Sequence, residues 1–318
     1  MKTQLFALAT ALAFGSLMAS PVRAQANRPL IPEIVDVTHA TKKSVAFFHS
    51  FFMAKSRHDV DATMNHFSKS TLTYIDATLG WPFYTHGALK DVFVQYMPKW
   101  PATGLSYPTR ILGDERSALV AFTDTPELFG AEIRILAAID IKDGKVVRWV
   151  DYWDGRHFGA ELAAEMRTPS DKFPTDFKEA TVPGNASPKI RAAANKLHAA
   201  FAGNDAKAAA ALFSSDAVYE DMTLRTQILG RLAIERYLGR ALDKLPAGAG
   251  SSMLHVVGGD MGGGFEWQTA PAYRTTVPRG ISAIALDQDG KVLRLTTVWD
   301  GAMVAQGDIK TLMTLSIE

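Results

Sequence analysis

A tyrosine and an aspartate stand two residues apart in a short segment, as Tyr74 and Asp76, and the pair recurs as Tyr219 and Asp221. Alternate residues of a strand share one face, so each pair places a phenol beside a carboxylate. A carboxylate in apolar surroundings has a raised pKa and can transfer protons near neutral pH. The sequence is equally compatible with an Asp76 that only caps a turn before Gly80.

A longer segment is also written twice. DGKVVRWVDYWDG at residues 143–155 returns as DGKVLRLTTVWDG at residues 289–301, an offset of 146 residues. On a strand, one face of the first copy carries Trp149, Asp151 and Trp153. The same face of the second copy carries Leu295, Thr297 and Trp299. Only the first copy therefore adds a second carboxylate on that face.

The repeat extends over most of the chain. Asp59 and Asp205 are also 146 residues apart, and the turn glycines Gly87 and Gly230 match after small gaps. Such a period indicates duplicated domains. Each copy predicts an amphipathic helix, a short second helix with an aspartate cap, a short strand, a third helix, and three or four closing strands with an Asp-Gly hairpin turn.

Changes in composition along the chain predict the boundaries of its domains. We expect a signal peptide at 1–26, an N-terminal arm at 27–41, domain 1 at 42–158, a linker at 159–187, domain 2 at 188–304 and a C-terminal tail at 305–318. The signal peptide is indicated by Lys2, the apolar stretch Leu5–Met18 and small residues around Ala24 and Ala26. An uncleaved anchor helix is the alternative. The linker is rich in proline and begins with a short helix, Gly159–Met166.

The composition excludes several classes of function. The 318 residues carry 34 basic and 33 acidic side chains, so no basic excess exists to hold nucleic acid. There is no cysteine, hence no disulfide, thiolate metal site or cysteine nucleophile. No two histidines have metal-binding spacing. The glycine-rich run 258–264 lacks the lysine and helix of a phosphate loop and predicts a hairpin. We expect no cofactor, no metal and no contact with a membrane after signal removal.

The order helix–helix–strand–helix–sheet, closed by a strand of the type DGKV-x-R-x-x-x-Y-W, resembles the nuclear transport factor 2-like superfamily. The resemblance covers Lys42–Gly155 and Pro188–Met303 and is nearest to the SnoaL-like polyketide cyclases and the ketosteroid isomerases. It implies an α+β fold of two tandem cone-shaped domains, each a curved, mostly antiparallel sheet wrapped around helices with a central pocket. It also implies sheet-to-sheet pairing, as an intrachain pseudo-dimer or a homo-oligomer.

The resemblance assigns roles to particular residues. In ketosteroid isomerase-like members the aspartate at the Asp76 position is the general base, and the aromatic residue at the Trp153 position faces the pocket. Asp151 would then face it too, unless it is an exposed residue paired with Arg148 or Arg134. The expected catalytic residues are Asp76, Asp151, His86 and Tyr74. The expected substrate-binding residues are Trp81, Phe83, Tyr84, Trp100, Trp149 and Trp153. A second pocket would be lined by Tyr219, Asp221 and Trp299.

The sequence departs from the ketosteroid isomerases at their oxyanion donors. Their tyrosine on the first helix corresponds here to Phe51 and Leu197, and their second acid has no counterpart near Leu136 or Ala283. A steroid isomerase mechanism is therefore not indicated. An oxyanion partner must come from elsewhere, with Tyr74, Tyr84, His49 and His86 as candidates.

Three functional hypotheses follow from these residues. The first is a secreted or periplasmic, cofactor-independent lyase or isomerase that acts by general acid–base catalysis on a hydrophobic, aromatic or polyketide-like small molecule. The second is a non-catalytic protein of the same fold that binds a lipophilic ligand. The third is a structural pseudo-dimer whose pockets are filled by side chains. The fold is compatible with all three.

The signal peptide generates a first prediction. We expect the exported protein to begin near Gln25 or Asn27, because the small residues before these positions suit signal peptidase. Intact-mass measurement of protein purified from a native host checks this, and a mass that includes Met1 would contradict it.

Overall fold

The computed structural model describes residues 30–174, 176–180, 182–271 and 279–317, so the expected signal peptide lies outside the described residues. The first half contains five helices and seven strands in the described part. They are β1 (Asp36–Ala40), α1 (Lys42–Ser56), α2 (Val60–Met64), β2 (Thr73–Asp76), β3 (Trp81–Phe83), α3 (His86–Tyr96), the 3-10 helix η1 (Met97–Lys99), β4 (Ser106–Gly113), β5 (Ser117–Asp124), α4 (Pro126–Phe129), β6 (Ile133–Lys142) and β7 (Lys145–Tyr152).

The second half repeats this order. Its elements are α6 (Pro188–Ala202), α7 (Ala206–Ala210), β8 (Phe213–Asp221), β9 (Thr226–Leu229), α8 (Arg231–Ala241), β10 (Ser252–Gly258), β11 (Gly262–Gln268), β12 (Arg279–Leu286) and β13 (Val292–Trp299). Between the halves lie η2 (Gly155–Phe158) and α5 (Gly159–Met166), the helix predicted at the start of the linker. The chain continues through η3 (Gly301–Met303) to α9 (Gln306–Thr314), which packs into the core of domain 2.

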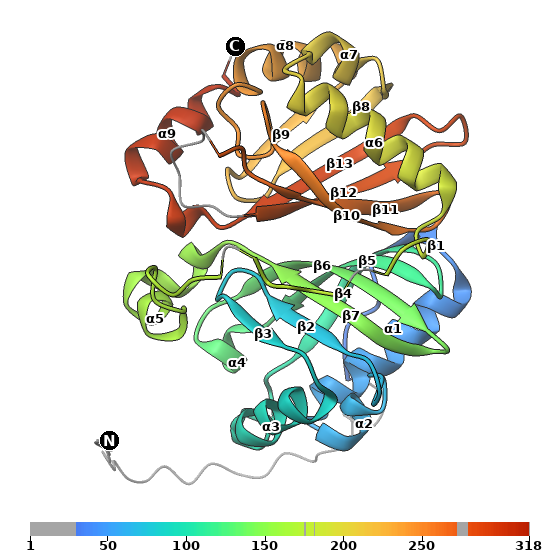
Figure 1. The fold of residues 1–318 in the computed structure, drawn as a ribbon, viewed down its shortest axis with the longest axis vertical. Helices are drawn as coiled ribbons and strands as arrows, with labels where there is room; N and C mark the ends of the chain where they lie inside the picture. The colour runs from blue at the N-terminus through green and yellow to red at the C-terminus, as the bar shows by residue number, and fades with distance from the viewer. Residues whose placement is uncertain (1–29, 175, 181, 272–278, 318) are drawn as a thin grey trace, which may run out of the picture.

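Each half forms its own mixed sheet. The strand order is β1-β4-β5-β6-β7-β2-β3 in domain 1 and β10-β11-β12-β13-β8-β9 in domain 2. All neighbours pair antiparallel except β1 with β4, β2 with β7 and β8 with β13. The two sheets lie against each other across the middle of the molecule, and helices α1–α3 and α6–α8 lie on their outer sides (Figure 1). The predicted α+β fold of two tandem domains is confirmed, and the N-terminal arm contributes β1 to the first sheet.

Local sequence signals explain the element boundaries. Asp59 and Asp205 cap α2 and α7 by accepting hydrogen bonds from backbone N–H groups. Asp143 and Gly144 both have positive φ, as a type I′ hairpin turn requires. The prediction that Gly87 and Gly230 are equivalent turn glycines was wrong. Gly87 lies inside α3, whose cap is Thr85, whereas Gly230 itself caps α8.

The two sheets pack through small and branched side chains. The interface core combines residues from both sheets with Phe177 of the linker, namely Leu112, Leu119, Leu136, Ala138, Val150, Val257, Ile281, Ala283, Ala285 and Val298. The glycine-rich run, predicted to be a hairpin, joins β10 to β11. Its glycines allow the sheets to approach closely, since a Cβ at Gly264 would lie 2.5 Å from Leu119 Cδ1.

A buried charge network crosses this interface. Arg148 of β7 contacts Glu266 of β11 at 2.6 Å, and Tyr152 donates to Glu266 at 2.6 Å. Arg279 of β12 donates to Tyr152 at 2.7 Å and pairs with Glu179 of the linker at 2.7 Å. Arg148 also contacts Glu179. Two arginines and two glutamates therefore compensate each other and join both domains to the linker.

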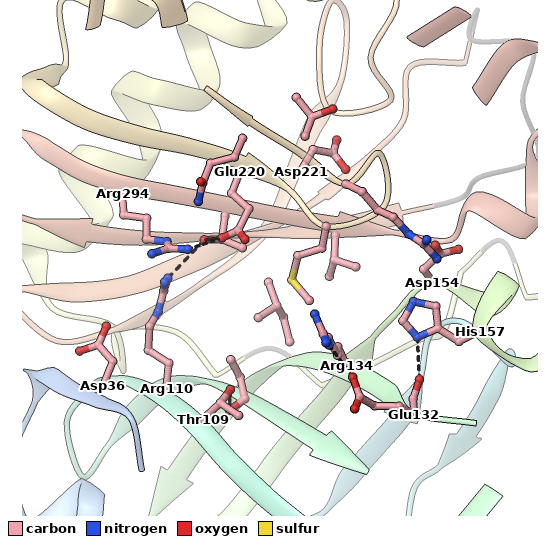
Figure 2. Close-up of a pocket in the computed structure, with 18 of the residues that line it drawn as sticks. Asp36, Thr109, Arg110, Glu132, Arg134, Asp154, His157, Glu220, Asp221 and Arg294 are labelled. Carbon is pink, nitrogen blue, oxygen red and sulfur yellow. Dashed lines mark hydrogen bonds and ion pairs between the residues drawn. The ribbon is translucent and has the colours of Figure 1, made fainter. Parts of the chain in front are cut away.

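At one side of the interface, a groove of about 1010 Å³ opens between the sheets (Figure 2). Arginines and carboxylates from both domains line it. This groove is separate from the pocket inside domain 1, which contains most of the residues singled out in the sequence.

The buried network generates a stability prediction. Glu266→Gln should lower the free energy of unfolding by about 3–5 kcal/mol, because it leaves two buried arginines with one carboxylate fewer. Urea denaturation monitored by circular dichroism measures this change. The matched control is Glu165→Gln at an exposed position of α5, which should have little effect; equal effects of the two substitutions would contradict the role of the network.

Candidate active site

Domain 1 encloses a cavity of about 130 Å³ between its sheet, α3 and the start of the linker. Its walls are mainly apolar and aromatic, and include Trp81, Phe83, Phe93, Trp100, Phe122, Phe129, Trp153, Phe158 and Met166. Six ionisable side chains also line it: Lys55, Tyr74, Asp76, Tyr96, Asp124 and Asp151. An apolar cavity with a few convergent polar groups is the usual form of a small-molecule site.

Asp76 lies at the end of β2. Its Oδ1 accepts hydrogen bonds from the backbone N–H groups of Thr78 and Leu79 at 3.0 and 2.8 Å. The indole N–H of Trp153 donates to its Oδ2 at 3.1 Å. The same carboxylate thus caps the turn before Gly80 and lines the cavity.

Asp151 lies beside Asp76, since the two residues are register partners in the parallel pair β2–β7. Tyr74 donates its hydroxyl to Asp151 Oδ2 at 2.5 Å, and the indole of Trp149 donates to Oδ1 at 2.6 Å. The side chain is buried. The alternative of an exposed Asp151 paired with Arg148 or Arg134 was therefore wrong.

Burial shifts the acidity of both carboxylates. It raises the pKa of Asp76 to about 6, although the hydrogen bonds from Leu79 and Trp153 oppose the shift. It raises the pKa of Asp151 to about 7, and the negative charge of Asp76 adds to this effect. Burial and the adjacent Asp151 also hold the pKa of Tyr74 well above its usual value. The pair can therefore hold one proton near neutral pH, as an acid next to a base.

The sequence analysis missed Lys55 and Asp124. Lys55 Nζ lies 3.2 Å from Asp124 Oδ1 and 5.1 Å from the ring centroid of Phe122, and both charged side chains are buried. Lys55 stands four residues after Phe51 on α1, on the same helical face, at the inner end of a stripe of phenylalanines. The sequence signal that could have identified Lys55 is a lysine at a position that continues an apolar stripe of the helix.

The remaining predicted site residues divide into two groups. Trp81, Phe83, Trp100 and Trp153 line the cavity. Tyr84, His86 and Trp149 do not. Tyr84 is half exposed and donates to the carbonyl of Phe177, and a ring nitrogen of His86 lies 3.2 Å from the carbonyl oxygen of Met64. Trp149 lies deeper in the core, where its indole N–H donates a hydrogen bond to Asp151.

In the described part of domain 2, side chains fill the region of the predicted second pocket. Tyr219, Asp221 and Trp299 are each only 1% exposed. Helix bounds and strand register place Phe201, Thr269 and Thr297 at the positions of Lys55, Asp124 and Asp151. Domain 2 retains the tyrosine and the first aspartate of the set. It lacks the lysine and the other two carboxylates.

The third helix of each domain accounts for this difference in volume. In α8 the stripe Ile234, Tyr237, Leu238 and Ala241 is fully buried. The corresponding residues of α3 are Leu89, Val92, Phe93 and Tyr96, of which only Leu89 is buried. The ring of Tyr237 packs 5.2 Å from that of Tyr219, whereas the smaller Val92 stands at its position in domain 1 and leaves the cavity open.

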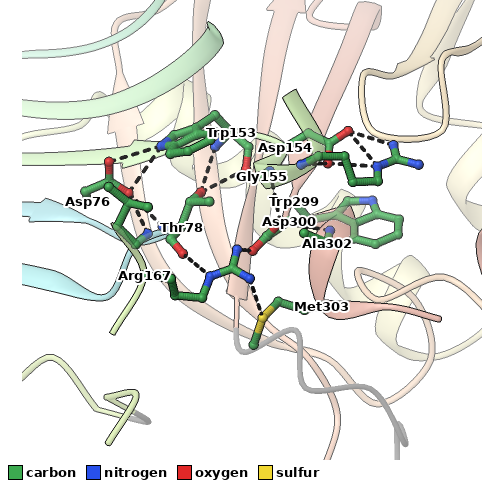
Figure 3. Close-up of polar contacts among 12 residues, drawn as sticks. Asp76, Thr78, Trp153, Asp154, Gly155, Arg167, Trp299, Asp300, Ala302 and Met303 are labelled. Carbon is green, nitrogen blue, oxygen red and sulfur yellow. Dashed lines mark hydrogen bonds and ion pairs between the residues drawn. The ribbon is translucent and has the colours of Figure 1, made fainter. Parts of the chain in front are cut away.

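The repeated Trp-Asp-Gly motif forms a shared structural joint (Figure 3). Trp299 donates to Asp221 at 3.1 Å, just as Trp153 donates to Asp76. In each copy a threonine, Thr78 or Thr223, bonds the backbone N–H and C=O of the tryptophan. The motif therefore joins the closing strand to the turn that follows β2 in domain 1 and β8 in domain 2.

Its aspartates and glycines join the two domains. Asp300 accepts from Gly155 N at 3.0 Å and pairs with Arg167, which also donates to the carbonyl of Thr78 (Figure 3). Arg156 likewise joins Asp154 to the carbonyl of Thr223. A Cβ at Gly155 would lie 2.8 Å from Arg167 Nη2, so the glycine leaves room for the guanidinium.

The described ranges contain neither a cluster of metal-binding side chains nor a membrane-spanning helix. No group of three or more histidine, aspartate or glutamate side chains is arranged to hold a metal ion there. Across the same ranges, every helix is too short or too polar to cross a bilayer.

Both halves have the α+β architecture that the resemblance implied, a curved mixed sheet with helices on one side. No family model and no curated protein matches the sequence. Solved structures similar to this chain include a steroid delta-isomerase from Pseudomonas aeruginosa (14% identity, 43% of this chain and 93% of that one, TM-score 0.33). Others are an NTF-2 like protein of unknown function from Burkholderia xenovorans (23%, 39% and 91%, TM-score 0.30) and an uncharacterized protein with a cystatin-like fold from Silicibacter pomeroyi (17%, 40% and 83%, TM-score 0.32).

The acidity of Asp151 generates a second stability prediction. Its folded pKa of about 7 exceeds the ordinary value of 3.8, so the folded state holds the proton more tightly and loses stability as the pH rises between these values. Each tenfold difference in proton affinity between the folded and unfolded states costs at most about 1.4 kcal/mol. Asp151→Asn resembles the protonated acid and should raise the melting temperature at pH values above the folded pKa.

The measurement is thermal unfolding as a function of pH. The difference between Asp151→Asn and wild type should shrink as the pH falls. Asp143→Asn, in the exposed hairpin turn, is the matched control and should show no such trend. A variant that is less stable than wild type throughout the range would mean that the carboxylate is mainly structural.

Proposed function

We propose that domain 1 is a cofactor-independent lyase or isomerase that uses general acid–base catalysis on a small hydrophobic molecule, and that the protein is exported. The observation that supports the activity is the pair Asp76 and Asp151, which lie side by side in an apolar cavity with pKa values of about 6 and 7. Export is supported by the basic, then apolar, start of the chain.

The residues divide the chemistry among them. Asp76, the stronger acid of the pair, is the base that removes a proton from carbon next to a carbonyl group. Asp151, oriented by Tyr74 and Trp149, returns a proton as the acid. The ammonium group of Lys55, held by Asp124, stabilises the oxyanion of the intermediate. Lys55 thereby takes the place of the tyrosine that the ketosteroid isomerases carry on this helix.

The volume of the cavity narrows the substrate class. At about 130 Å³ it is comparable to engineered cavities of about 150 Å³ that bind benzene. A single-ring aromatic or alicyclic carbonyl compound fits such a space, and its ring can stack on the aromatic walls. A polycyclic polyketide exceeds this volume.

One observation favours the alternative of a non-catalytic binding protein. Every carboxylate oxygen of Asp76 and Asp151 already accepts a hydrogen bond from a protein donor. Such satisfaction is typical of structural carboxylates. A catalytic test must therefore separate proton transfer from binding.

We predict that Asp76→Asn lowers turnover by about 10²–10⁴-fold, as expected for the loss of a general base. Single-ring ketones are first screened by ligand-induced shifts in melting temperature. Turnover is then measured as deuterium incorporation from D₂O at the carbon next to the carbonyl, which needs no knowledge of the product. The rate should rise as Asp76 loses its proton and fall as Asp151 loses its own.

Asp221→Asn is the matched control, because Asp221 also caps a turn and accepts from a tryptophan but is buried in the filled domain. It should cost less than about tenfold on the same scale. A larger loss in Asp221→Asn than in Asp76→Asn would place the active site in domain 2. Binding without exchange in wild type would favour the binding protein.

A further inference from the structure

The groove between the domains is far larger than the domain 1 cavity. Strands β4–β6 form one wall, and β8 and β13 of domain 2 form the other. Its lining also includes the half-buried apolar side chains of Ala121 and Met222. Arg110 and Arg294 mark one end of the groove, whereas Arg134 and His157 lie toward the other (Figure 2).

Arg110 extends from β4 of domain 1 toward domain 2. Its one hydrogen bond among the described residues is a long one, from Nη2 to Thr296 Oγ1 at 3.5 Å. No described carboxylate lies within ion-pair distance, although Asp36 and Glu220 stand nearby (Figure 2). Burial lowers the pKa of Arg110 to about 10, and the like charge of Arg294 adds to the shift. This guanidinium therefore keeps a charge that the described side chains compensate only in part.

Arg294 is the second cation at this end. It pairs with Glu220 at 2.7 Å, but the same Glu220 oxygen also accepts from Thr296 at 3.1 Å. The Nε of Arg294 is buried and has no hydrogen-bond partner among the described residues. Two guanidinium groups from different domains thus lie close together, and some of their N–H donors have no hydrogen-bond acceptor among the described residues.

We propose that this end of the groove binds the carboxylate of an amphipathic organic acid whose apolar body lies against Ala121 and Met222. Guanidinium groups bind planar carboxylates through paired, charge-assisted hydrogen bonds. The bound carboxylate supplies the counter-charge that Arg110 lacks among the described side chains. Both domains contribute, so the site exists only when the two sheets are docked.

The test is isothermal titration calorimetry of the full chain with phenylbutyrate, its neutral analogue phenylbutanol, and inorganic phosphate. Phenylbutyrate should bind at millimolar concentration or below, and tighter than both other probes. Arg110→Gln should weaken phenylbutyrate about tenfold or more, the usual effect of losing charged hydrogen bonds. It should leave the melting temperature unchanged or higher, because it breaks no ion pair.

The matched control is Arg231→Gln, which removes the same charge at an exposed position of α8 outside the groove. Equal weakening in Arg231→Gln would reduce the effect to overall charge and overturn the site. The site would also be overturned if wild type did not bind phenylbutyrate, or if Arg110→Gln bound it as tightly as wild type does. If phosphate bound as tightly as phenylbutyrate, the apolar part of the site would be refuted. A markedly lower melting temperature in Arg110→Gln would assign Arg110 a structural role.

Discussion

The hydrogen bond from the Trp153 indole to the Asp76 carboxylate is the contact on which the domain 1 site depends. It fixes the end of the closing strand against the turn after β2, and so sets the parallel register of β2 and β7. That register places Asp151 beside Asp76. The same bond, between Trp299 and Asp221, fixes the same strands in domain 2. One interaction therefore supports the architecture in both domains and the proposed chemistry in one.

The two domains share this frame but differ in what fills it. In domain 1 a valine on α3 and a charged pair, Lys55 with Asp124, leave an open space with a polar wall. In domain 2 Tyr237 and Phe201 occupy the corresponding volume. A filled core stabilises through burial and dispersion, whereas a cavity with two buried carboxylates costs stability. One copy therefore has a filled core, whereas the other keeps a cavity with two buried carboxylates.

The linker connects these two copies. Met166 of the linker and Phe158, the last residue of domain 1, line the domain 1 cavity, and Arg167 directly follows the helix that carries Met166. Arg167 bonds both the turn beside Asp76 and Asp300 of the second copy. This part of the cavity lining is thus anchored on domain 2, and the buried network around Glu266 holds the two sheets in the orientation that this anchor needs. The same docking creates the groove lined by Arg110 and Arg294.

The sequence by itself determined the duplication, the fold and the faces of the strands, because a fixed offset and a two-residue alternation are local properties of the chain. It therefore indicated Asp76, Asp151 and Trp153. Only the tertiary structure decided which side chains meet in the cavity. Lys55 and Asp124 are far apart in the chain, and Tyr84 and His86 follow the aromatic run closely but point elsewhere. Whether a cone stays open depends on the summed volume of side chains from several elements, which no single segment encodes.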